Sequence, residues 1–149
     1  MVTFIGEYTA KIDDRGRLVL PSAFKSLLCE SGDVRLVVKK DLFAPCLGMF
    51  TFEEWERQSA RVLASLNPFN EEHARFRREF MRGRAVVEPD PKFGRIAIPR
   101  KLLDAIGADK EVVFSGNDYK IELWSAREYE QSGIPGEEYL AIAAKLSQQ

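Results

Sequence analysis

The sequence has little of what metal-dependent or nucleophilic catalysis uses. It holds one histidine, His73, and two cysteines, Cys29 and Cys46, in 149 residues. These residues lack the spacing of a zinc site, and no glycine-rich phosphate loop, nucleophile elbow or metal-hydrolase motif is present. We therefore expect no catalytic residue, no metal ion and no cofactor, and the protein is predicted not to be an enzyme. The cysteines are expected to be reduced packing residues, and His73 a solvated surface residue.

Long hydrophobic runs are also missing. No apolar run approaches the ~18 residues that a membrane-spanning helix needs, and residues 1–7 lack the basic start and apolar stretch of a secretory signal. Hydrophobic residues make up 45% of the chain and charged residues 30%, a balance typical of a folded globular protein. We expect a cytoplasmic protein without a membrane partner, and no motif indicates a small-molecule ligand.

The formal net charge is −1, so an overall excess of positive charge is absent too. Phosphate binding requires a local basic face rather than a basic protein. One segment of ten residues is strongly basic, and it contains Arg75, Arg77, Arg78, Arg82 and Arg84. This run is either a second phosphate-contacting surface or a solvated or subunit-contacting helix face. We favour the second reading, because Phe76 and Phe80 of the same segment are expected to pack inward.

What the sequence does contain is one block that occurs twice. Gly16-Arg17-Leu18-Val19-Leu20-Pro21 recurs as Gly94-Arg95-Ile96-Ala97-Ile98-Pro99, and residues 47–56 resemble residues 121–130. Two copies are too few for a solenoid. We therefore predict two half-domains related by a pseudo-two-fold axis, each of which covers the core of the other.

Hydrophobic periodicity and capping residues predict the same order of elements in each half: strand, turn, strand, helix, strand, strand, helix. The first half should have strands over 7–12, 17–20, 34–39 and 47–52, and helices over 21–31 and 51–66. The second half should have strands over 85–88, 95–98, 111–114 and 120–124, a hairpin turn at 115–118, and helices over 99–107 and 125–131. Helix 70–81 should connect the halves, and the last helix should be amphipathic, with Tyr139, Leu140, Ile142, Ala143 and Leu146. We accordingly expect a first half at 1–69, a connecting helix at 70–84, and a second half with a C-terminal helix at 85–149.

Two predicted turns carry the residues with recognition chemistry. Asp13-Asp14-Arg15-Gly16-Arg17 and Asp90-Pro91-Lys92-Phe93-Gly94-Arg95 each place an arginine after a glycine at a hairpin tip, with an aspartate shortly before. An arginine fork can grip phosphate oxygens, or O6 and N7 of guanine, and a two-stranded ribbon fits the major groove of DNA. Each turn could instead be a solvated loop with a weak surface ion pair. The repetition favours recognition.

The sequence Gly-Arg-apolar-x-apolar-Pro leading into a helix resembles the AbrB-like, swapped-hairpin DNA-binding proteins. Its tandem occurrence, together with the start Phe4-Ile5-Gly6-Glu7-Tyr8, resembles the MraZ family of bacterial transcriptional regulators, and the resemblance covers essentially the whole chain. The family signature is a repeated Asp-x-x-x-Arg. Asp13 and Arg17 match it, whereas Asp90 and Arg95 are separated by one extra residue.

The resemblance implies an α+β fold, a tandem pseudo-two-fold repeat of AbrB-like swapped-hairpin β-barrel halves with peripheral helices. It also implies a nucleoid-associated regulator of the division and cell-wall gene cluster, which binds double-stranded DNA at direct repeats upstream of its own operon as a homo-oligomeric ring. The residues expected to form the DNA interface are Lys11, Asp13, Arg15, Arg17, Lys92, Arg95 and Arg100. Arg100 could equally face water. The alternative is a protein-interaction or antitoxin-like module of the same fold.

Overall fold

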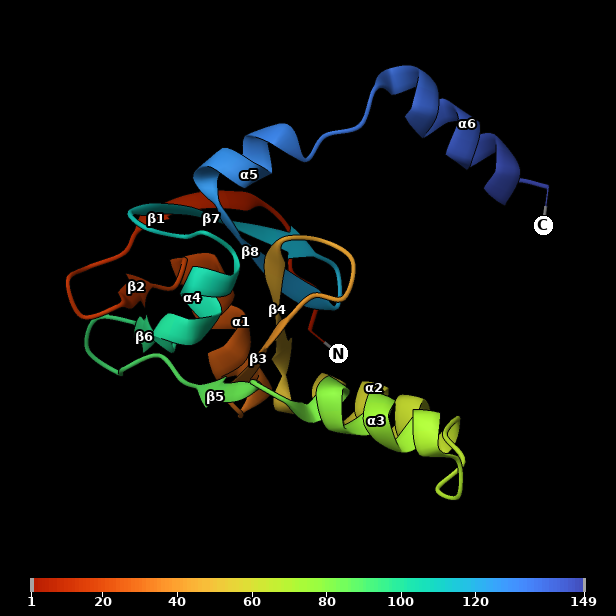
Figure 1. The fold of residues 1–149 in the computed structure, drawn as a ribbon. Helices are drawn as coiled ribbons and strands as arrows, with labels where there is room; N and C mark the ends of the chain where they lie inside the picture. Colours follow the sequence, from red (N-terminus) through yellow and green to blue (C-terminus); the bar gives the residue numbers. More distant parts are fainter. Residues whose placement is uncertain (1, 149) are drawn as a thin grey trace.

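The structure is a computed structural model that describes residues 2–148, and these residues form a mixed α+β fold (Figure 1). The first half contains β1 (Glu7–Lys11), β2 (Arg17–Val19), α1 (Ser22–Ser31), β3 (Leu36–Lys40), β4 (Cys46–Thr51) and α2 (Phe52–Ala64). After α3 (Glu71–Met81) come β5 (Ala85–Val87), β6 (Arg95–Ala97), α4 (Arg100–Ala105), β7 (Glu111–Asn117), β8 (Lys120–Ser125), α5 (Ala126–Gln131) and α6 (Gly136–Leu146). The predicted order of elements is confirmed.

The predicted hairpin turn at 115–118 is wrong in position. Strand β7 continues to Asn117, and its residues Ser115 and Gly116 pair with Glu122 and Ile121 of β8. The chain therefore reverses after Asn117, where Asp118 adopts a φ of 59°. Aspartate tolerates this left-handed conformation.

The strands of the two halves are interleaved in one open antiparallel sheet. The order in this sheet is β1-β7-β8-β4-β3-β5, and β2 pairs with β6 in a separate two-stranded ribbon. Strands β1 and β2 follow one another along the chain, yet β1 pairs with β7 and β2 with β6. Strand β5 likewise pairs with β3 rather than with β6. The two strands that flank each predicted tip therefore do not pair with one another. Each of them instead buries its apolar side chains against the other half of the chain.

One hydrophobic core joins the ribbon, the sheet and the helices α1 and α4. Alternate residues of the ribbon point into this core, and Leu18 and Ile96 are both essentially inaccessible to solvent. The repeated apolar residue three places after each proline is buried in both copies, as Phe24 in α1 and Leu102 in α4. The repeat in the sequence therefore corresponds to a repeat in packing.

Helices α2 and α3 pack outside this core around a smaller apolar cluster. Trp55 of α2 is buried against Val37 and Phe50, and its ring stacks on Phe80 of α3 with centroids 5.7 Å apart. Trp124 of β8 is also buried. Three helices begin at a residue whose side-chain oxygen accepts a backbone N–H three residues later; these caps are Thr51, Asn70 and Ser125.

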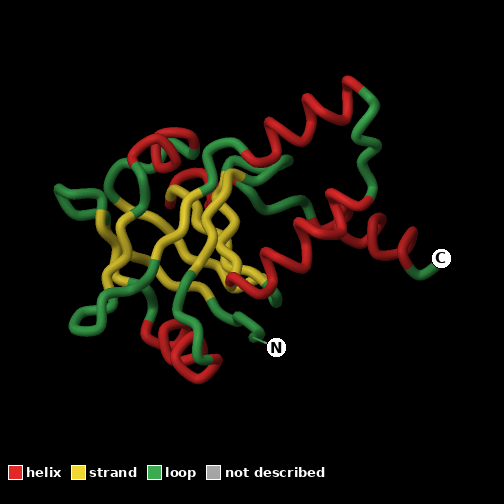
Figure 2. Tube along the Cα trace, turned by 90° about the horizontal axis from the view of Figure 1, so that it is seen from below, coloured by secondary structure: helices red, strands yellow, loops and turns green. Residues whose placement is uncertain are grey.

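Helix α6 projects away from the rest of the chain (Figure 1), and none of its residues is buried. Figure 2, seen from below, shows the loops around the ribbon on one side of the molecule and the C-terminal helix on the opposite side. Over residues 2–148, no helix combines the length and the apolar character that crossing a membrane would require.

Candidate nucleic-acid interface

The first tip, residues 13–17, is shaped by the carboxylate of Asp13. Its Oδ1 accepts the backbone N–H groups of Arg15 and Arg17 at 2.9 and 2.8 Å, and its Oδ2 accepts Nε–H of Arg17 at 2.8 Å. These bonds, above all the one from the Arg17 backbone, lower the pKa of Asp13, so the carboxylate is ionised at neutral pH. Asp13 therefore holds the turn and orients the arginine at the same time.

The second tip, residues 90–95, is shaped by an aspartate in the same way, although it has one more residue. Asp90 Oδ1 accepts the backbone N–H groups of Lys92 and Phe93 at 3.1 and 2.6 Å. Its Oδ2 accepts the backbone N–H and the Nε–H of Arg95 at 2.8 and 3.2 Å. The pKa of Asp90 is lowered well below its usual range, chiefly by the Phe93 N–H. Asp90 thus makes the same contacts with Arg95 as Asp13 makes with Arg17, despite the changed spacing.

A glycine precedes the arginine in both tips because the turn needs a left-handed residue there. The φ angles are 76° at Gly16 and 70° at Gly94, values that side-chain-bearing residues rarely adopt. Each glycine carbonyl also accepts a hydrogen bond from the other half of the chain. Leu20 donates to Gly94 at 2.9 Å, and Ile98 donates to Gly16 at 3.3 Å. Each tip is therefore anchored to the strand that leaves the other tip.

The register of the ribbon places both arginines on one face. Arg17 pairs with Ala97 and Arg95 pairs with Val19 across the β2–β6 ladder, and paired residues of an antiparallel ladder point to the same side. Leu18 and Ile96 point to the opposite side, into the core. The arginines consequently lie on the outer face of the ribbon, and both tips extend from the same side of the molecule (Figure 1).

Both arginines keep hydrogen-bonding capacity toward solvent. Each uses Nε to hold its aspartate, while Nη1 and Nη2 make no hydrogen bond to any residue within 2–148. About a third of each arginine side chain is exposed, 30% for Arg17 and 33% for Arg95. Ion pairs this exposed add little to stability. Their effect is to fix the guanidinium plane and leave its outer edge for a paired acceptor such as a phosphate or a guanine.

Further cations surround the second tip. Lys11 at the end of β1 and Lys92 line one shallow depression together with Lys25 of α1. Lys25 Nζ donates to the Pro91 carbonyl at 3.4 Å. Sequence reasoning missed Lys25, because the corresponding residue of the second copy is the buried Leu103 and no local pattern marks the lysine.

The other predicted interface residues differ in how they are placed. Arg15 is exposed in the first tip. In the second tip, the guanidinium of Arg95 lies 4.8 Å from the ring centroid of Phe93. Arg100 begins α4 and lies 4.0 Å from Asp104. Among residues 2–148, Arg100 makes no hydrogen bond or ion pair to either tip, so the structure does not group it with the others.

Helix α3, which carries the first arginines of the basic run, lies away from both tips (Figure 1), and the run ends at Arg84, directly before β5. All of its arginines are exposed. The prediction that both phenylalanines of this segment pack inward is only half right: Phe80 is half-buried against Trp55, but Phe76 stacks on Phe80 and stays 41% exposed. The reason is that α3 covers the periphery and meets the sheet only near its C-terminal end.

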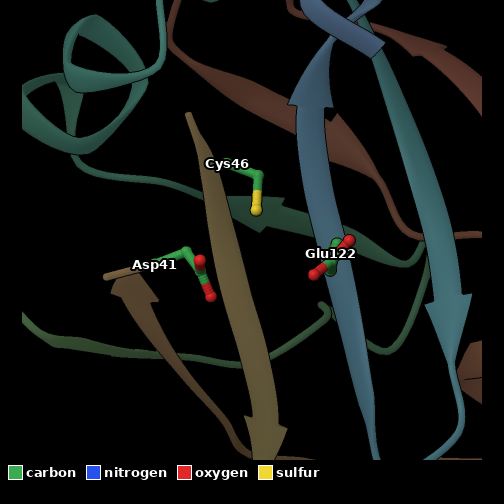
Figure 3. A group of neighbouring side chains, drawn as sticks. All are labelled: Asp41, Cys46 and Glu122. Carbon is green, nitrogen blue, oxygen red and sulfur yellow. The ribbon is translucent and has the colours of Figure 1, made fainter. Parts of the chain in front are cut away.

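One cluster has metal-ligand chemistry among residues 2–148, and Figure 3 shows its three members, Asp41, Cys46 and Glu122. A lysine already supplies the positive charge there. Lys120 Nζ lies 3.5 Å from Asp41 Oδ1 and 3.3 Å from Glu122 Oε2. Burial raises the pKa of Cys46 to about 12, so the thiol is protonated at neutral pH beside this ion pair. The arrangement is that of an ion-pair network.

His73 has a defined structural contact that the sequence reading did not predict. Its Nδ1 accepts the backbone N–H of Asn67 at 2.8 Å, and the backbone N–H of His73 donates to Oδ1 of the cap Asn70. His73 lies at the surface as expected, but it is half-buried rather than fully solvated, and it closes the turn between α2 and α3.

The two cysteines should differ sharply toward a thiol reagent at pH 8. Cys46 is fully buried with a raised pKa, whereas Cys29 is exposed. We expect one equivalent of thiol per native chain to react within minutes, and the second only in denaturant. Absorbance titration with a disulfide reagent measures this. Cys29→Ser should abolish the fast phase, and two fast equivalents in the native protein would contradict the buried position of Cys46.

Comparison with known proteins identifies a matching family model and several similar proteins. Residues 80–133 match the family model described as "MraZ protein, putative antitoxin-like". The chain is similar to a protein named "Transcriptional regulator MraZ" from Bacteroides thetaiotaomicron, with 32% identity over 98% of this chain and 93% of the relative. Proteins of the same name are 38% identical in Lachnoclostridium phytofermentans, over 93% of this chain and 92% of the relative, and 36% identical in Acetivibrio thermocellus, over 97% and 96%.

Proposed function

The chain belongs to the MraZ family, and from this premise we propose that it regulates transcription by binding double-stranded DNA through its two arginine-bearing tips. The observation that carries the proposal is the pair Arg17 and Arg95, held on one outer face with Nη groups that make no hydrogen bond to any residue of 2–148. In this role Arg15, Arg17 and Arg95 make the main contacts, and Lys11, Lys92 and Arg100 support them. Asp13 and Asp90 position the arginines. The relatives' printed name, transcriptional regulator, argues against an enzyme.

The same proposal includes the site of action. The protein binds direct repeats upstream of its own operon, in the division and cell-wall gene cluster, as a cytoplasmic, nucleoid-associated homo-oligomeric ring. Physical chemistry supports the multiple contact, since a single tip with few cations binds DNA weakly and in a salt-dependent way. Several tips on repeated half-sites raise avidity by ~10²–10⁴ without new contacts. Because this chain has a net charge of −1, binding through several tips raises its affinity for DNA considerably.

We also propose that the chain is a fused pair of AbrB-like swapped-hairpin halves, residues 1–69 and 85–149, joined by a connecting helix within 70–84. The crossed pairings support this: β1 with β7, β2 with β6, and β5 with β3. So do the matching carboxylate–arginine contacts of the two tips. In such a fold, duplicating the half-domain within one chain presents two equivalent tips at a fixed distance.

The alternative function is a protein-interaction or antitoxin-like module, which the wording of the family model favours. In that case the tips would be turns without a nucleic-acid ligand. Copurification of a stoichiometric, identified protein partner would support this reading over the first.

The decisive experiment is a fluorescence anisotropy titration of the purified protein. The duplexes are the DNA upstream of its own gene and a scrambled duplex of equal length, each at two salt concentrations. We expect selective binding to the upstream duplex that persists at the higher salt, because base contacts add to the counterion term. Equal binding to both duplexes that disappears with salt would contradict sequence recognition and favour the protein-interaction alternative.

A further inference from the structure

The two tips are alike in their aspartate–arginine contacts, but different side chains lie beside their glycines. Beside the second tip is Lys25 of α1, whose Cδ is 3.2 Å from the place that a Cβ on Gly94 would take. Beside the first tip is Leu103 of α4, whose Cδ1 is 4.0 Å from the corresponding place on Gly16. Lys25 and Leu103 are equivalent in the repeat, since each follows the buried apolar residue three places after the proline. The repeat therefore puts a lysine beside one tip and a buried leucine beside the other.

The ammonium of Lys25 keeps most of its capacity to bind an acceptor. Its Nζ donates to the Pro91 carbonyl at 3.4 Å, a long contact, and an ammonium has three N–H donors. Among residues 2–148, Lys25 forms no ion pair. Lys25 thus gives the second tip a positive charge that no carboxylate neutralises, at a place where the first tip has an apolar side chain.

Lys25 shares an open depression of about 570 Å³ with two other lysines, Lys11 at the end of β1 and Lys92 in the second tip. We call it the lysine depression. No aspartate or glutamate is among its lining residues, and none of the three lysines forms an ion pair within residues 2–148. Cations from three separate segments that line one depression without a carboxylate make it attractive to an anion.

The charges of the repeat differ in the same direction elsewhere. Two residues before the tip aspartate, the first half has Lys11 and the second half has Glu88. Within the first tip, two aspartates balance two arginines, whereas in the second tip one aspartate is accompanied by Lys92 and Arg95. The surroundings of the second tip are therefore the more basic of the two.

We propose that the lysine depression holds a backbone phosphate of DNA, so that the second tip anchors the protein to the duplex and the first tip has no such anchor. The inference rests on the proposed function, because the depression adjoins the strand that carries Arg95. A lysine binds phosphate as a point charge, and such a contact positions the protein without reading sequence. The difference gives each chain a preferred direction on DNA, since exchanging the tips would put the phosphate beside Leu103 instead of Lys25.

Lys25→Met tests the anchor, because it removes the charge and keeps an unbranched side chain against Gly94. On a duplex with a single upstream repeat, the slope of log affinity against log salt should fall in magnitude by about one. At about 0.1 M salt, affinity should fall roughly tenfold, for the upstream and the scrambled duplex alike. Fluorescence anisotropy titrations at several salt concentrations measure both quantities. An unchanged slope in Lys25→Met would overturn the proposal.

Two further variants serve as controls. Lys25→Arg keeps the charge and should keep the slope of the wild type. Lys145→Met removes the same charge from α6, on the side of the molecule opposite the ribbon (Figure 2), and should leave slope and affinity unchanged. A loss in Lys145→Met equal to that in Lys25→Met would mean that only the net charge matters, and would contradict a phosphate site at the lysine depression.

Phosphate ethylation interference locates the contact on the DNA, because ethylation removes the charge of one backbone phosphate. At the phosphate in the lysine depression, ethylation should weaken binding of the wild type. It should have no further effect on the variant in which Lys11, Lys25 and Lys92 are all replaced by methionine. If ethylation weakens both proteins equally at every phosphate, the depression does not bind the backbone.

A purely structural role of Lys25 predicts a different result. If Lys25 only supported the tip through Pro91, Lys25→Met would lose discrimination between the upstream and scrambled duplexes, as expected for Arg95→Ala, with an unchanged slope. That result would overturn the proposal and leave the proposed function standing. Equal binding of both duplexes by the wild type would instead overturn sequence recognition, while a lower slope in Lys25→Met would still support the phosphate contact.

Discussion

Arg17→Ala should remove ~1–3 kcal/mol of discrimination between the upstream repeat and a mismatched duplex, the size of one bidentate arginine–base contact. Nε–H of the guanidinium donates to Asp13 at 2.8 Å and the side chain is 30% exposed, so the substitution deletes the contact without disturbing the core. Arg17→Lys should lose nearly as much specificity, because an ammonium keeps the charge but has no fork. Arg95→Ala should behave similarly, since the second tip repeats these contacts. Competition titrations with repeat and mismatched duplexes at one salt concentration measure the effect.

Lys92→Ala is the matched control for charge. Lys92 is exposed in the second tip, and the one side-chain interaction of its ammonium within residues 2–148 is with the ring of Phe93, at 5.1 Å. We expect this variant to weaken binding to all duplexes about equally and to lower the slope of log affinity against log salt by about one. Unchanged discrimination in both Arg17→Ala and Arg95→Ala would remove the tips from the recognition mechanism.

Leu18→Ala and Ile96→Ala should each lower the free energy of unfolding by about 2–5 kcal/mol, the usual cost of truncating a large buried side chain. The two residues face one another at the centre of the ribbon, directly behind the arginines, and are 1% and 0% exposed. Urea denaturation followed by circular dichroism measures the effect. Because they are in contact across the ladder, the double variant should deviate from additivity.

Val19→Ala provides the comparison within the same strand. Val19 points outward and is 55% exposed, so its truncation should cost less than about 1 kcal/mol. Equal losses for Leu18→Ala and Val19→Ala would mean that the ribbon is not anchored in the core as the register implies.

The order of elements and the position of the tips could be predicted because local signals decide them. Alternating apolar residues, the prolines that precede α1 and α4, and the caps Thr51, Asn70 and Ser125 act within a few residues. The arginine of each tip follows a glycine that the turn requires, so the repeated Gly-Arg pair identified both tips. The expectation that each half covers the core of the other came from the repeat itself, because two copies are too few for a solenoid.

The contacts that could not be predicted join segments that are far apart in the sequence, or they depend on how far a long side chain extends. The spacing of Asp90 and Arg95 did not indicate that Asp90 would accept four hydrogen bonds. A carboxylate can make the same contacts with the arginine when the turn has one more residue. Lys25 reaches the second tip from a helix in the other half. Lys120 bridges two carboxylates from different halves. The sequence carries no local signal for such pairings.

The pairing of β1 has a consequence for how the chain is made. Glu7 pairs with Ser115, so an early segment leaves the ribosome with its apolar residues exposed and waits until more than a hundred further residues have been synthesised. Contacts this far apart slow folding, and uncovered strand edges invite association with other nascent chains. Release of the completed chain, rather than emergence of the first half, should therefore be the moment at which the fold forms, and fragments that end before β7 should require chaperones to stay in solution.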